Sequence, residues 1–147
     1  MEAFVPLRHA VTGAVSRYHV MHPGGGTAYA TSYTVQKIVE GYEGGEKPAV
    51  LQAGHYHKLE FINIRNVWVL QAGCTQDQTV FARKKKITFS IGGGILYLRQ
   101  NPETGAIEEA MPYTKHYFNK GYYQNNRWSL SGPVTKVPRV FGFREAA

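Results

Sequence analysis

The sequence predicts an α/β protein that becomes mostly β after residue 58. Residues 14–53 follow the order strand, glycine-rich loop, helix, strand, which is typical of a βαβ unit. Residues 59–111 are short runs of β-branched and aromatic residues separated by turn signals, as expected for antiparallel strands. A chain of 147 residues, 43% of them hydrophobic, can bury one core, so we expect a single domain over residues 1–147.

The first strand of the βαβ unit is expected over residues 14–21. The segment before it, residues 1–13, fits either a short strand or a lead-in segment. The strand ends at His22-Pro23-Gly24-Gly25-Gly26, where the proline keeps His22 out of the helical conformation. The three glycines then predict a tight connection, whose amides could also face a phosphate.

Apolar residues at helical spacing predict a helix over residues 27–42. Thr27 is a candidate N-cap, and Gly41 or Gly44 is expected near the helix end. The apolar run over residues 48–53 then predicts a buried strand that completes the unit.

The second half of the chain predicts antiparallel strands. A β-hairpin is expected over residues 59–72, with Arg65-Asn66 as its two-residue turn. The remaining expectations are a polar loop over 73–79, a strand pair over 87–91 and 95–99 broken by the glycines 92–94, a turn over 101–105, and a strand over 106–111. Residues 101–147 form an aromatic and basic tail, which we expect to be ordered by docking its aromatic side chains.

The most distinctive stretch is Gly54-His55-Tyr56-His57, directly after the predicted buried strand. In extended backbone, residues i and i+2 point to the same side, so His55 and His57 would present their imidazoles to one place. Gly54 would allow a sharp turn and the close approach of a ligand. We expect a metal site here; the simpler alternative is a pair of polar loop residues that are hydrogen-bonded locally. His9, His19 and His116 are interpreted as surface or packing histidines.

Charge and composition narrow the function classes. The net charge is +7 and the isoelectric point is near 9.6, which favours partners that carry phosphate, including nucleic acid. The basic run Arg83-Lys84-Lys85-Lys86 is a candidate phosphate contact, and its alternative is a solvated stretch at the start of a strand. Nine of the ten acidic residues are glutamates and Asp77 is the only aspartate, so the chain offers few of the carboxylates that hydrolytic metal sites prefer.

The same composition bears on location. We expect no membrane span and no signal peptide, and therefore a cytoplasmic protein, in the host cytoplasm if it is phage-encoded. The single cysteine, Cys74, excludes an internal disulfide and fits a small packed side chain in a reducing compartment.

The chain resembles the C-terminal half of a calcineurin-like metallophosphoesterase. The features that carry this resemblance are His22 after a strand, the helix that follows it, and the Gly-His-Tyr-His loop. The strand that leads into Ala72-Gly73-Cys74 also resembles the segment that follows the Gly-His-x-His motif in that family. The resemblance covers residues 14–100 and is greatest to phage and prokaryotic members. It implies half of a metallophosphoesterase-type β-sandwich flanked by helices.

The resemblance also implies a dinuclear metal centre. In the family two ions, often manganese, iron or zinc, lie at the strand ends, clamp a phosphate ester and activate water for in-line attack. By this resemblance, His22 and His55 would bind one ion and His57 the other. Neutral imidazole suits such transition metals.

The chain departs from the family in lacking its N-terminal motifs. The Asp-x-His, Gly-Asp-x-x-Asp and Gly-Asn-His motifs do not occur, and Asp77 lies downstream of the histidine motif rather than upstream. Three imidazoles do not neutralise two divalent cations, so the site is incomplete on its own and the chain contributes no catalytic residue beyond its metal ligands. The first hypothesis is therefore a split phosphoesterase, a nuclease or phosphodiesterase whose two divalent ions (Mn, Fe or Zn) are shared with a partner chain that supplies Asp, Asn and His ligands.

Two alternatives stay open. The chain is a non-catalytic structural or nucleic-acid-binding module on the same half-fold, docked in a homo-oligomer or larger assembly, with Arg127, Lys136 and Arg139 in its aromatic tail. Otherwise, His22, His55 and His57 hold a single zinc ion with water as the fourth ligand.

Overall fold

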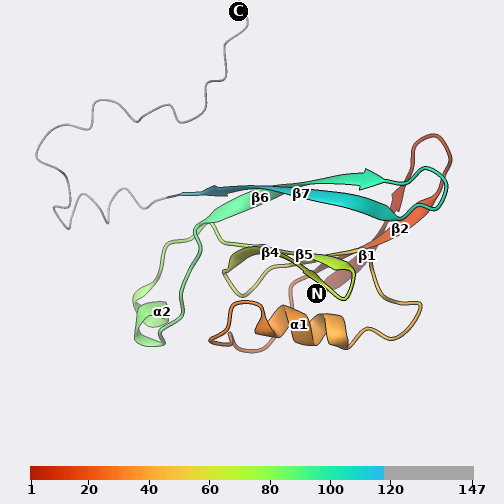
Figure 1. Ribbon diagram of the computed structural model, residues 1–147. Helices are drawn as coiled ribbons and strands as arrows, with labels where there is room; N and C mark the ends of the chain where they lie inside the picture. The colour runs from red at the N-terminus through yellow and green to blue at the C-terminus, as the bar shows by residue number, and fades with distance from the viewer. Residues whose placement is uncertain (118–147) are drawn as a thin grey trace, which may run out of the picture. The chain divides into compact units, whose positions relative to one another are not determined.

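The structure is a computed structural model that describes residues 1–117 (Figure 1). Of the described residues, 44% lie in strands and 11% in helices, so this part of the chain is mostly β rather than evenly α/β. Predictions for residues 118–147, including the aromatic and basic tail beyond Tyr117, lie outside the described residues. The assignment to half of a metallophosphoesterase β-sandwich stays a prediction.

A mixed five-stranded sheet forms the centre of residues 1–117. Its strand order is β1-β2-β3-β5-β4, with β2, β3 and β5 parallel to one another and the edge strands β1 and β4 antiparallel to their neighbours. The strands are β1 (Glu2–Arg8), β2 (Val15–Met21), β3 (Val50–Ala53), β4 (Leu59–Ile64) and β5 (Val67–Ala72). The segment before residue 14 is therefore a strand, and the predicted strands over 14–21 and 48–53 and the hairpin over 59–72 are confirmed.

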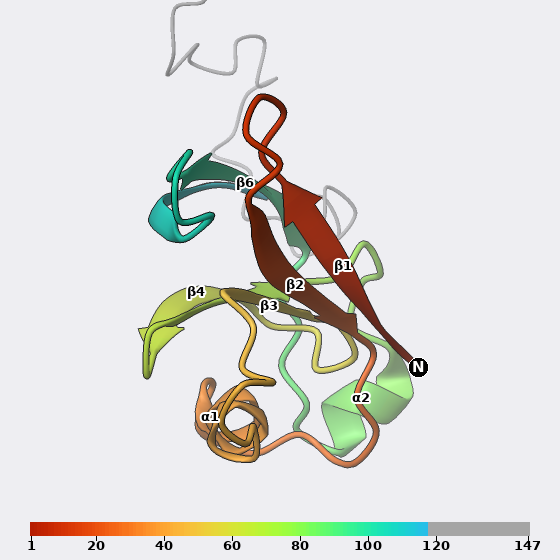
Figure 2. The same ribbon diagram turned by 90° about the vertical axis from the view of Figure 1, so that its right-hand side faces the viewer.

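Helix α1 (Tyr33–Glu40) covers one face of this sheet (Figures 1 and 2). Val35 and Val39 are its two fully buried residues, and they pack against the fully buried Leu51 and Val69 from the sheet. Burying a side chain of this size contributes about 1.5–3 kcal/mol, so these contacts hold α1 on the sheet.

The predicted helix over 27–42 was too long at its N-terminal end. The helix begins after Ser32, not at Thr27, because side chains from distant parts of the chain bind the carbonyl groups of the preceding segment. The Nζ of Lys58 donates to the carbonyl oxygens of Ala28 and Ala30, at 2.9 and 3.1 Å. The C-terminal end agrees with the prediction, since Gly41 is the C-cap.

A second, two-stranded sheet lies over the opposite face of the five-stranded sheet (Figure 2). It consists of β6 (Gly92–Gln100) and β7 (Ile107–His116), which pair antiparallel. The expected strand over 95–99 is confirmed as part of β6, but the strand over 87–91 and the break at glycines 92–94 are wrong: the glycines belong to β6, and residues 87–91 form no strand. Glycine is needed at Gly92 because a Cβ there would fall on the carbonyl oxygen of Lys115 in β7.

A short helix, α2 (Val80–Lys84), occupies the connection between the two sheets and was not predicted. Thr79 caps it, since its side-chain oxygen accepts from the backbone N–H of Ala82 at 3.1 Å. No helix among residues 1–117 is long and apolar enough to span a membrane.

Candidate metal centre

The candidate site lies where the parallel strands end. Met21, Ala53 and Gln71 are neighbours across β2, β3 and β5, so the loops that leave these strands share one edge of the sheet. His22 directly follows β2, and His55 follows β3 after Gly54. Loops at the carboxyl edge of parallel strands are the usual location of binding sites in open sheets.

The structure brings His22 and His55 into direct contact. The Nδ1 atom of His55 lies 3.0 Å from the Nε2 atom of His22, and the two ring planes cross at 75°. His22 is exposed and His55 half-buried, so both rings are accessible from solvent.

The tautomer of His55 follows from its other ring nitrogen. Nε2 lies 2.9 Å from the carbonyl oxygen of Gly25. Because a carbonyl oxygen only accepts, the proton of neutral His55 is on Nε2, and the lone pair on Nδ1 faces His22. A histidine that donates one N–H to a backbone carbonyl and leaves the other nitrogen free has the arrangement of most metal-ligating histidines.

His57 lies beside this pair but in a different environment. Its ring packs edge-on against Phe89, with 4.2 Å between the ring centroids. Burial lowers the pKa of His57 below its ordinary value of 6.5, and electrostatic interaction with His55 and His22 lowers it further. Its imidazole is therefore neutral at pH 7, as a metal ligand must be.

The prediction that His55 and His57 share a side because the backbone is extended was wrong. Both residues adopt the left-handed conformation, with φ of 73° and 56°. They make the sharp turn that was expected of Gly54, whose own φ is not positive. Left-handed backbone at two non-glycine residues is uncommon and costs roughly 1–3 kcal/mol each, and such strain is concentrated at functional sites.

Side chains from the loop over residues 54–58 bind the loop that follows His22. Besides the contact from His55 to Gly25, the hydroxyl of Tyr56 donates to the carbonyl oxygen of Gly24 at 3.3 Å. Lys58 binds the next part of the same loop through Ala28 and Ala30. These hydrogen bonds fix the two histidine-bearing loops relative to each other.

The residues present fit part of a metal centre. Two imidazole nitrogens bound to one tetrahedral ion lie about 3.3 Å apart, given metal–nitrogen bonds of about 2.0–2.1 Å. The 3.0 Å between His22 and His55 is close to that separation. Among residues 1–117, however, no group of three or more His, Cys, Asp or Glu side chains is arranged to hold a metal ion. The three histidines therefore make an incomplete donor set.

The nearby carboxylates are bound elsewhere. Glu60 accepts from the side-chain amide of Gln71 at 2.6 Å, and Asp77 accepts from the backbone N–H of Gln78 at 2.8 Å. Among residues 1–117, no carboxylate is therefore assembled with the histidines as the bridging ligand that a dinuclear centre needs.

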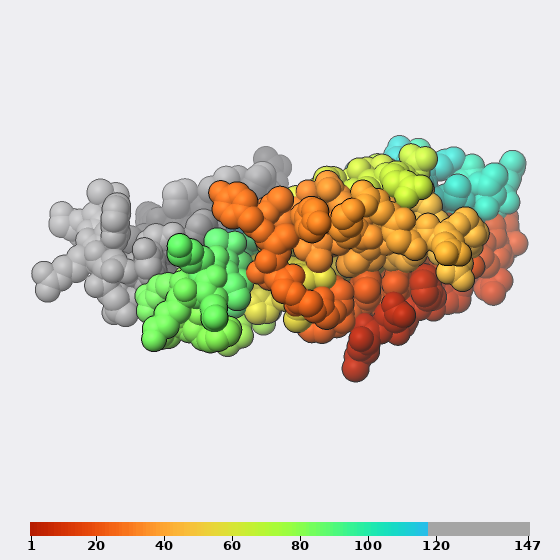
Figure 3. Space-filling model, turned by 90° about the horizontal axis from the view of Figure 1, so that it is seen from below, coloured from red at the N-terminus to blue at the C-terminus, as the bar shows by residue number. Residues whose placement is uncertain are grey.

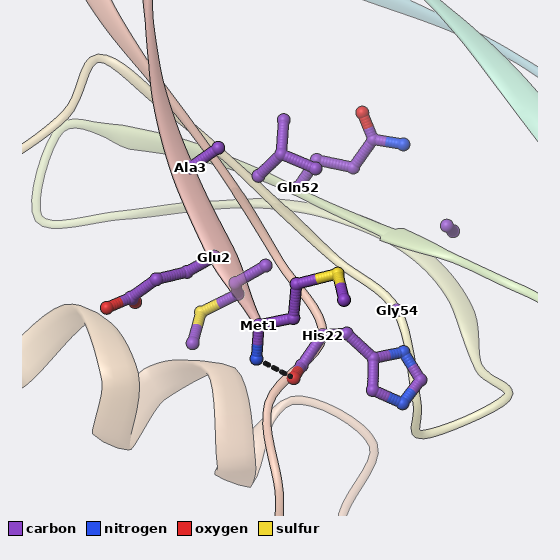
Figure 4. Close-up of a pocket in the computed structure, with 9 residues that line it drawn as sticks. Met1, Glu2, Ala3, His22, Gln52 and Gly54 are labelled. Atoms are coloured by element: carbon purple, nitrogen blue, oxygen red, sulfur yellow. Dashed lines mark hydrogen bonds between the residues drawn. The ribbon is translucent and has the colours of Figure 1, made fainter.

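An apolar groove of about 320 Å³ opens beside His22 (Figure 4). It lies between the start of β1 and the ends of β2 and β3, with Ala3, Met21 and Gly54 among its lining residues. Met1 closes one end, where its ammonium donates to the carbonyl oxygen of His22 at 3.4 Å.

The basic run Arg83-Lys84-Lys85-Lys86 is exposed, but it ends a helix instead of preceding a strand. Arg83 and Lys84 form the last turn of α2 and Lys85 is its C-cap. Positively charged side chains stabilise the C-terminal end of a helix by interacting with its dipole. The basic run can therefore stabilise α2 whether or not it also binds a ligand. The structure records no contact between these side chains and the three histidines.

Two buried polar residues near the site were missed from the sequence. Lys58 is buried although it is charged, and nothing in the alternation of residues 55–60 indicates this. Gln71 is also buried; its amide donates to the carbonyl oxygen of Thr31 at 3.1 Å, while Oε1 has no partner among the described residues. The sequence does carry a signal for Gln71, because it is a polar residue inside the otherwise apolar run Val67–Ala72.

Comparisons with protein-family models, with curated proteins and with solved structures find no match to this chain.

Proposed function

We propose that this chain supplies the imidazole ligands of a dinuclear metal-dependent phosphoesterase, a nuclease or phosphodiesterase, and that a partner chain supplies the carboxylates. The observation that carries the proposal is the arrangement of His55, which donates from Nε2 to Gly25 and directs the lone pair of Nδ1 at His22. The neutral His57 beside them is the third ligand.

Each histidine has a defined part in this proposal. His22 and His55 bind one ion, and a cation between their nitrogens displaces the proton that they share. His57 binds the second ion, with its ring oriented by Phe89. When bound, two divalent ions polarise a phosphate ester and activate water.

The experiment is a reconstitution. The full chain is isolated from its native source together with the chains that accompany it, loaded with Mn²⁺, and assayed on bis(4-nitrophenyl) phosphate. We expect phosphodiester hydrolysis that His55→Ala abolishes and that His116→Ala, a histidine on β7, leaves unchanged. A verified complex with a carboxylate-bearing partner that shows no hydrolysis, or equal hydrolysis by both variants, would contradict the proposal.

A second candidate function is a non-catalytic nucleic-acid-binding module. The observation that favours it is the exposed basic run over residues 83–86, beside Phe81, whose side chain is 67% exposed. Basic side chains that track a backbone and an aromatic ring that stacks on a base are the usual elements of single-strand binding. Equal affinity for a labelled oligonucleotide in the wild type and in a triple variant of His22, His55 and His57 to alanine would favour this function.

A further inference from the structure

A small pocket whose lining includes none of the three histidines lies between the loop that follows the three glycines and the segment that follows α2. It is lined by residues 27–29, Lys58 and residues 86–88, and its volume is about 110 Å³. Figure 3 shows the two segments, orange and green, beside each other on one face of residues 1–117. Drug-sized ligands need roughly 300–1,000 Å³, so this pocket has room for one small group only.

The pocket contains a buried positive charge. Lys58 is only 7% exposed, and its Nζ atom donates to the neutral carbonyl oxygens of Ala28 and Ala30. These bonds satisfy its donors but leave its charge, and none of the ion pairs among residues 1–117 includes Lys58. Buried charges in proteins are ordinarily paired, so the pocket lacks a negative charge.

The other polar side chains around the pocket are donors. Lys86 adds a second ammonium, and Thr27 and Thr88 add hydroxyl groups. No side-chain hydrogen bond to these three residues is found within the described part of the chain, and the lining contains no acidic residue. Lys86 also adopts the left-handed conformation, with φ of 56°, which is uncommon for a lysine.

We propose that this pocket binds a tetrahedral oxyanion of the phosphate class, either inorganic phosphate or the terminal phosphate of a nucleotide. A phosphate supplies the missing negative charge beside the Lys58 ammonium and offers only acceptor oxygens to the ammonium of Lys86 and the hydroxyl groups of Thr27 and Thr88. The volume admits the phosphoryl group and leaves the rest of a nucleotide outside. Binding needs neither metal nor partner chain, so this proposal is independent of the phosphoesterase proposal.

The test is a titration of the full, metal-free chain followed by amide NMR spectra. Inorganic phosphate and a nucleoside 5′-monophosphate are the two probes, and the unphosphorylated nucleoside and chloride are the negative controls. We expect saturable shifts confined to residues 27–29, Lys58 and 86–88 with one or both probes. Equal affinities indicate free phosphate as the ligand, and tighter binding of the monophosphate indicates a nucleotide.

Matched variants distinguish a built site from general charge attraction. Lys86→Ala should weaken phosphate binding about tenfold, as expected for the loss of one charge-assisted hydrogen bond. Lys85→Ala removes the same charge from the neighbouring residue, which is exposed like Lys86 but does not line the pocket, and should change affinity less than twofold. Thr88→Val should weaken binding without any change in charge. Equal losses in the two lysine variants, or no localised shifts with either probe, would overturn the proposal.

Discussion

Replacing Gly92 by alanine tests the close approach of β6 and β7 in the two-stranded sheet. Gly92 begins β6 opposite His116. A Cβ at this position would overlap the carbonyl oxygen of Lys115 and would lie 3.2 Å from both the His116 Cα atom and the Leu59 Cδ2 atom. The backbone of β7 must therefore move. At Gly93, the next residue, an added Cβ meets nothing within 4 Å.

The magnitude follows from the two environments. Overpacking that shifts backbone costs about 1–3 kcal/mol, and the weakened pairing at the start of β6 adds to this, so we expect Gly92→Ala to lower the free energy of unfolding by about 3 kcal/mol. Gly93→Ala should be neutral or stabilising by about 0.4–1 kcal/mol, because alanine reduces the entropy of the unfolded chain. For a chain of this length, the melting temperature of Gly92→Ala should lie roughly 6–12 °C below that of the wild type.

The assay is thermal and urea unfolding followed by circular dichroism, with both variants and the wild type measured in parallel. Equal urea m-values in the three proteins would confirm that the variants change stability and not the unfolding transition itself. A Gly92→Ala protein that is as stable as Gly93→Ala would refute the close approach of β6 and β7 on which the reasoning depends.

Four further predictions concern the core and the loops. Leu51→Ala, at a fully buried core position, should lower the free energy of unfolding by about 2.7–5 kcal/mol in urea unfolding. Burial, with the charge of Glu2, raises the pKa of Tyr42 to about 12 in the folded chain. The contribution of Tyr42 to the free energy of unfolding is therefore complete below pH 10 and is lost between pH 10 and 12. Tyr42→Phe should remove about 1 kcal/mol of this loss of stability in unfolding titrations, which is less than the full pKa shift implies because the ring is only half-buried. The lowered pKa of His57 means that the metal-free chain loses stability as pH falls below 6.5, and His57→Gln should flatten this acid dependence in unfolding titrations. Lys58→Met should increase amide hydrogen exchange over residues 28–31 while Lys85→Met does not, because Lys58, unlike Lys85, donates hydrogen bonds to those carbonyl groups.

The strands that the sequence predicted best are those whose turn is encoded locally. Arg65 and Asn66 both adopt positive φ, at 50° and 65°, which is the two-residue turn that a hairpin over residues 59–72 requires. The alternation of residues on either side then sets the register, so β4 and β5 agree with the prediction at both ends. The position of His22 and His55 at one edge of the sheet also followed from the βαβ order.

The remaining features depend on contacts between distant residues. Helix α1 begins late because Lys58 and Gln71, from other elements, bind the carbonyl groups of residues 28–31. Gly92 belongs to β6 because the backbone of β7 passes close to it. The local propensity of three consecutive glycines, by contrast, indicates an interruption of the strand at this point. Neither contact leaves a signal in the residues next to it, so local patterns could not predict these features.

The central claim, that three of the six histidines are metal ligands, is tested most directly by the ring resonances of the histidines in the full chain during a titration with Mn²⁺. Mn²⁺ is paramagnetic and broadens nearby resonances even when it binds weakly. The account predicts that His22, His55 and His57 broaden at Mn²⁺ concentrations that leave His9 and His116 sharp. Uniform broadening of all the histidines, or no broadening of His22 and His55, would contradict the assignment of these residues to a metal centre.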